Sequence, residues 1–289
     1  MVTSHSLLAL LILLGDSLIS DNAVYRVITM LSLPTPPAVA RTYTPGGYAD
    51  PYDAVVDYQT YDCEFRDSTL GSTAISRRMA VPRGRIRSWE RGSQPDAVHG
   101  LAVAREHGWL NCSVDSEPFA ALNRLVASVF SGGSVSEAFE PAFLTPTESV
   151  EHQLRSDLSA IGAGCQQIDS NSADHIDLRP TEHKAVLGRI LVALGAPQGL
   201  KTESAERLPA YLEWVVPEIR REFVRIYLLN RATDRDGKHY LQISERRPDD
   251  YLVSLAELVH AVSGVDVQVS DRSIRVHEDV LPMLDIALP

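Results

Sequence analysis

The feature that most constrains the fold is a tandem repeat of predicted elements between residues 118 and 286. Hydrophobic periodicity predicts, twice, a helix, a strand, a helix, two strands and a helix. The first set is expected at 118–131, 138–144, 147–161, 165–169, 175–179 and 181–194. The second is expected at 217–230, 239–244, 248–263, 265–269, 273–276 and 278–286. Matching glycines, Gly162 and Gly264, lie about 100 residues apart, which predicts an α+β fold of two αβαββα units related by a pseudo-two-fold axis.

A shorter pattern, from Ser72 to Gly92, predicts two helices joined by a turn. One small core can be shared by Ile75, Met79, Val81, Ile86 and Trp89. Ser72 or Thr73 can cap the first helix, Pro82 suits the first turn of the second, and Gly92 suits its end. The stretch resembles the helix-turn-helix of DNA-binding regulators, whose second helix enters the major groove.

The charge of this stretch points to an anionic partner. Six arginines and one acid, Glu90, give residues 77–91 a charge of +5 in a chain of net charge −11. The resemblance implies that Arg83 and Arg85, at the start of the second helix, read base edges. Contacts to phosphates, which set affinity rather than sequence preference, are expected from Arg77, Arg78, Arg87 and Arg91.

The tandem repeat resembles the LAGLIDADG homing endonuclease family over about residues 117–288. The motif and its connector are matched, in degenerate form, at 125–135, 187–202, 208–211 and 220–228. The resemblance implies DNA cleavage by Mg²⁺ held on a carboxylate at the end of each central helix. Gly132 and Arg231 stand at those two positions, which predicts no metal site, no catalytic residue and no cofactor. In an alternative register Asp236 takes the second position, and Glu137 is the nearest acid in the first copy.

The combination is similar in parts to WhiA-type bacterial regulators, which join inactive LAGLIDADG domains to a helix-turn-helix. DNA contacts are therefore expected on the strands of the repeats, at Arg179, Gln242, Arg246, Arg247, Arg272 and Arg275. We expect a sequence-specific binder of double-stranded DNA, either a transcriptional regulator or a mobile-element relic. The alternatives are an active Mg²⁺-dependent homing endonuclease, a protein-interaction module, and a plain α/β domain with amphipathic helices.

Composition sets the remaining expectations. Of 27 basic residues 24 are arginines, and lysine scarcity at a net charge of −11 is typical of proteins adapted to high salt. Three scattered cysteines signal neither disulfides nor zinc, which favours a cytoplasmic protein. The apolar run at 7–14 is too short to span a membrane. The expected divisions are a helical leader (1–33), an irregular linker (34–66), the helix-turn-helix (67–110) and two repeats (117–195 and 208–288), consistent with a pseudo-two-fold monomer.

Overall fold

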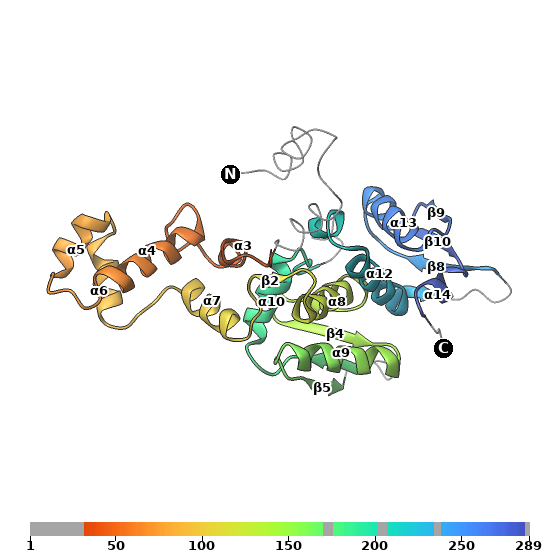
Figure 1. Cartoon of the computed structure of the whole chain (residues 1–289), viewed down its shortest axis with the longest axis horizontal. Coiled ribbons are helices and arrows are strands. Elements are labelled where there is room, and N and C mark those ends of the chain that lie inside the picture. The colour runs from red at the N-terminus through yellow and green to blue at the C-terminus, as the bar shows by residue number, and fades with distance from the viewer. Residues whose placement is uncertain (1–31, 170–175, 201–206, 234–237, 287–289) are drawn as a thin grey trace, which may run out of the picture.

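The computed structural model describes residues 32–169, 176–200, 207–233 and 238–286 (Figure 1). Nearly all of the predicted helical leader lies outside these residues. Its described end is strand β1 (Ser32–Leu33), which pairs with β2 (Cys112–Ser113). Asp236 of the alternative register also lies outside the described residues. No helix in the described part of the chain has the length and apolar character needed to cross a membrane.

The two repeats have the same topology, which confirms the predicted duplication. The first contains α8 (Glu117–Ser131), β3 (Ser134–Val135), β4 (Pro141–Thr145), α9 (Glu148–Ala160), β5 (Gln166–Asp169), β6 (Ile176–Arg179) and α10 (Lys184–Ala193). The second contains α12 (Pro217–Arg231), β7 (Ala232–Thr233), β8 (Tyr240–Ser244), α13 (Asp249–Ser263), β9 (Val267–Ser270), β10 (Ser273–His277) and α14 (Val280–Met283). A 3₁₀ turn, η1 (Ala210–Glu213), precedes α12.

Each repeat forms an antiparallel four-stranded sheet with the strands in one order. The orders are β3-β4-β6-β5 and β7-β8-β10-β9, so in both sheets the last strand lies between the second and the third. The first strand of each sheet has only two residues and directly follows the central helix. Each unit is therefore αββαββα, one short strand more than predicted.

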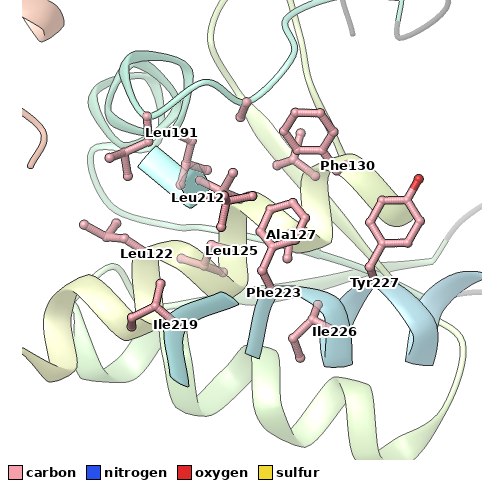
Figure 2. Close-up of a cluster of buried hydrophobic side chains, with 14 of the residues drawn as sticks. Leu122, Leu125, Ala127, Phe130, Leu191, Leu212, Ile219, Phe223, Ile226 and Tyr227 are labelled. Carbon is pink, nitrogen blue, oxygen red and sulfur yellow. The ribbon is translucent and has the colours of Figure 1, made fainter. Parts of the chain in front are cut away.

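Helices α8 and α12 pack against each other at the centre of the molecule and unite the repeats. Figure 2 shows buried apolar side chains that both helices contribute, among them Phe130 and Phe223, whose rings lie 5.9 Å apart. The buried side-chain amide of Asn123 inside this interface is fully engaged. The Asn123 side chain donates to the Ile219 carbonyl (2.9 Å) and accepts from the Tyr211 hydroxyl (2.8 Å). Buried amides are costly unless bonded, so these contacts favour one register of the two helices.

Residues 34–66, predicted as irregular, contain two helices instead. These are α3 (Pro36–Ala40) and α4 (Pro51–Glu64). Each begins with a capping residue followed by proline: Thr35 accepts from the Ala38 amide, and Asp50 accepts from the Tyr52 amide. Proline at the first helical position loses no hydrogen bond, so prolines that suggested a loop mark helix starts here.

Helices α5 (Ser72–Met79) and α6 (Arg83–Glu90) occupy the range of the predicted helix pair, and α7 (Asp96–Glu106) follows them. Of the five expected core residues four are buried, and Met79 is partly buried against them. Tyr58, Tyr61 and Phe65 of the α4 segment complete this core around Trp89, and the two tyrosine rings lie within 5.5 Å of the indole. The expected cap was wrong: Gly71 precedes α5 without a side-chain bond.

A clamp around Arg189 of α10 joins these N-terminal helices to the first repeat. Its guanidinium lies between the rings of Tyr43 (3.9 Å) and Phe139 (3.8 Å) and donates to the Thr42 carbonyl. The Tyr43 hydroxyl fills the space above Gly100 of α7, where a Cβ atom would clash. Stacking of arginine on two aromatic faces is a stabilising contact at such a junction.

A buried ion pair joins α8 to α9. Arg124 donates to Asp157 (Nε to Oδ1, 2.9 Å), and the Asp157 side chain is 1% exposed. Burial raises the pKa of Asp157 above its usual value even though Arg124 opposes the shift. Removal of the cationic partner of a carboxylate that is buried in this way destabilises the fold.

We therefore predict that Arg124→Met lowers the free energy of unfolding by about 3–5 kcal/mol at neutral pH, because Asp157 is left charged without a cationic partner and keeps only the hydrogen bond from Gln153. The raised pKa of Asp157 in the folded state means that protonation relieves this cost, so the loss shrinks as pH falls. Urea denaturation across a pH series measures both effects. Arg155→Met, which removes a more exposed arginine from α9, is the control, and equal losses in the two variants would contradict the prediction.

Candidate nucleic-acid interface

The two central helices end at a cavity of about 590 Å³, which we call the junction pocket. Gly132 follows the last residue of α8, and Arg231 is the last residue of α12. The pocket is lined by Phe130, Ser131, Gly132, Leu144, Arg231, Gln242, Ser244, Glu245, Arg246, Arg247, Arg272 and Ser273. It thus brings together the two positions at which the family resemblance places catalytic acids.

The charge of the junction pocket is strongly positive. Its lining has four guanidinium groups, on Arg231, Arg246, Arg247 and Arg272, and one carboxylate, on Glu245, which gives a formal charge of +3. The β8–β10 pairing brings these residues together, because the Glu245 amide donates to the Arg272 carbonyl (2.9 Å) just beyond the last paired strand residues. A cationic cavity in a chain of net charge −11 is a local site for anions.

The single acid, Glu245, is engaged on both oxygens. Its Oε1 accepts from the Tyr227 hydroxyl (2.7 Å) and from Arg231 Nε (3.1 Å), and its Oε2 lies 3.5 Å from Arg247 Nε. Burial raises the pKa of Tyr227 well above its usual value, so this phenol stays a neutral donor. Glu245 therefore serves as the counter-ion of two arginines.

Arg247 was expected to lie on the surface and contact DNA, but its side chain is only 3% exposed. Its Nη2 donates to the Phe130 carbonyl in the last turn of α8 (2.5 Å), and its guanidinium stacks 4.3 Å from the Tyr251 ring centre. Its Nη1 is buried without a hydrogen-bond partner in the described part of the chain. A guanidinium at a helix C-terminus satisfies a free carbonyl and opposes the negative end of the helix dipole.

The residues at the helix ends do not fit Mg²⁺. Gly132 has no side-chain ligand, Arg231 is cationic, and among the described residues no group of three His, Cys, Asp or Glu side chains could hold a metal. Packing does not require glycine at position 132. Its φ is −147°, and an added Cβ would meet the Leu144 Cβ at 3.4 Å, an ordinary contact.

The sequence does not show which side chains of each strand face the core and which face solvent, but their burial in the structure does. Leu241, Ile243 and Ile274 point into the core. Gln242 and Arg275 are register partners on the other face of the second sheet, with Arg275 exposed. On the first sheet Arg179 is exposed but lies 3.9 Å from Asp177. The polar face of the second sheet is therefore the more basic one.

The arginines of α5 and α6 form a second basic surface, far along the molecule from the second sheet (Figure 1). Side chains are exposed at Arg77, Arg78, Arg83, Arg87 and Arg91. Arg85 is half-buried instead. It donates to the Gly46 carbonyl (2.9 Å) and stacks on the Tyr48 ring (4.2 Å), so this expected base reader is held by the loop before α4. Burial, aided by a bond to Asp57, raises the pKa of Tyr48 to about 12.

No protein-family model matches the chain, and no curated protein matches it. Among solved structures the chain is similar to the N-terminal LAGLIDADG domain of DUF199/WhiA, with a TM-score of 0.40 and 10% identity over 62% of this chain and 88% of that one. It is also similar to full-length DUF199/WhiA from Thermatoga maritima, with a TM-score of 0.42 and 9% identity over 62% of this chain and 58% of that one. The chain thus spans less than two thirds of that full-length protein.

We predict that Glu245→Gln destabilises the fold by about 3–5 kcal/mol, because the buried Arg247 loses its counter-ion while the side-chain shape is kept. Chemical denaturation measures the loss. Glu257→Gln, which removes an exposed acid from α13, should stay within about 0.5 kcal/mol of the parent chain. If the Glu245 variant were as stable as this control, the Glu245–Arg247 ion pair would contribute nothing to the stability of the fold.

Proposed function

We propose that this protein binds a specific site in double-stranded DNA and does not cut it. The observation that carries the proposal is the set of five exposed arginines on α5, on α6 and at Arg91, directly after α6. They surround a core of their own and carry local positive charge in an acidic chain. Arg83, at the start of α6, takes the base-reading position, because an arginine fork matches the two acceptors of guanine.

The junction pocket supports the second half of the proposal. Metal-assisted cleavage needs oxygen ligands that hold a divalent cation against the scissile phosphate. In the described residues the helix ends offer a glycine and an arginine, and the one nearby carboxylate is engaged with two arginines. A protein with these features has the chemistry of a DNA-binding regulator, and we assign it that role.

The binding half is tested with the full chain and a duplex selected from a random library. Arg83→Ala should weaken binding by about 1–3 kcal/mol and relax the preference at one base pair. Arg78→Ala should weaken all duplexes alike and lower the salt slope by about 1. Arg105→Ala, an exposed arginine on α7, is the control. Equal affinity for selected and scrambled duplexes, at every salt concentration, would exclude sequence-specific binding.

The cleavage half is tested by incubating supercoiled plasmid with the protein and Mg²⁺. We expect no nicked or linear product. Product that requires Mg²⁺ and disappears in Asp236→Asn would establish the endonuclease alternative instead.

A further inference from the structure

We propose that the junction pocket is a metal-free binding site for a phosphate group. The inference rests on the proposed function only for the source of the phosphate, the DNA backbone, because binding at this pocket, which both repeats line, can be measured with inorganic phosphate alone. The pocket lies where the family resemblance places a bound metal cation. The ligand that we propose for it is an anion instead.

Two of the four arginines form the floor of the pocket. Arg231 bonds Glu245 through Nε and donates from Nη2 to the Ser244 carbonyl (2.9 Å). Arg247 is buried against Glu245, the Phe130 carbonyl and the Tyr251 ring. The floor thus has two guanidinium groups and one carboxylate, on Glu245. One buried donor of this floor, Arg247 Nη1, has no hydrogen-bond acceptor among the described residues.

The other two arginines form the rim. Arg246 and Arg272 are exposed, line the same pocket, and form no ion pair within the described ranges. The bond from the Glu245 amide to the Arg272 carbonyl holds the two segments side by side. Two free guanidinium groups above a positive floor are a donor set for a multivalent oxyanion.

The helix ends oppose an anion but do not outweigh the arginines. Each helix C-terminus carries an effective charge of roughly −0.5, so the two together offset about one positive charge. The pocket lining has a formal charge of +3, and the Phe130 carbonyl of α8 is already bonded to Arg247. The balance therefore remains positive where the two helices meet.

Phosphate fits this donor set better than a carboxylate does. Its oxygens accept from several guanidinium forks at once, whereas a carboxylate is saturated by one or two. A cavity of about 590 Å³ exceeds the needs of a single phosphate, which leaves space for the sugar of an ester. We therefore assign the pocket to a phosphate ester and take the backbone of bound duplex as its source.

The test is a calorimetric titration of the full chain with inorganic phosphate in low-salt buffer. The parent chain should show saturable binding. Arg246→Gln and Arg272→Gln should each weaken it about 10-fold or more, as expected when a charge-assisted hydrogen bond is lost. Arg105→Gln, an exposed arginine on α7 that does not line the pocket, should change it less than about 2-fold. Thermal melting of each variant checks that these exposed substitutions leave the fold intact.

Two results would overturn the inference: binding that does not saturate, or equal affinity in all four proteins. A duplex oligonucleotide added to the phosphate complex should displace the phosphate, and the persistence of both ligands together would reject the DNA backbone as the source. Arg83→Ala separates the inference from the proposed function, because it should weaken duplex binding and leave phosphate binding unchanged. Failure of phosphate binding with intact duplex binding would reject only the pocket, and the reverse result would reject only the proposed DNA function.

Discussion

The structure depends on the packing of α8 against α12. This contact joins two repeats that otherwise have their own sheets and their own outer helices. The Asn123 side chain, bonded to Ile219 and Tyr211, permits one register inside an apolar interface. At the other end of the pair, Asn230 donates to the Ser131 hydroxyl (2.7 Å). With the register set at both ends, the two helix C-termini meet. The residues at these C-termini determine the chemistry of the junction pocket.

A meeting point of two helix C-termini attracts positive charge. Where acids stand at the helix ends, a bound divalent cation can supply that positive charge. Here the side chains of Arg231 and Arg247 supply it. The two solutions have opposite consequences for ligands. Carboxylates with a metal ion leave a reactive Lewis acid, whereas arginines leave hydrogen-bond donors that hold a phosphate without activating water.

The sequence predicted the repeats well because their helices and strands carry regular apolar periods. Strands β3 and β7 have two residues each, too few to show a period. Helix α4 was missed because two of its four buried residues are tyrosines, Tyr58 and Tyr61, in a segment otherwise rich in proline, glycine and aspartate. The junction pocket could not be predicted, since its residues come from segments up to about 140 positions apart and only long-range pairing unites them. Nor does sequence separate Arg246 from its buried neighbour Arg247.

The tyrosines of α4 also define the smallest part of the chain that can carry the arginine helices. A fragment covering only residues 67–110 would lack Tyr58, Tyr61 and Phe65, and the Trp89 indole would face water along the surface that these rings now cover. The same fragment would lose the Gly46 and Tyr48 contacts of Arg85. Helix α4 and the loop before it therefore form one structural unit with α5 and α6. A truncation or recombination that keeps this unit intact has to break the chain upstream of Gly46.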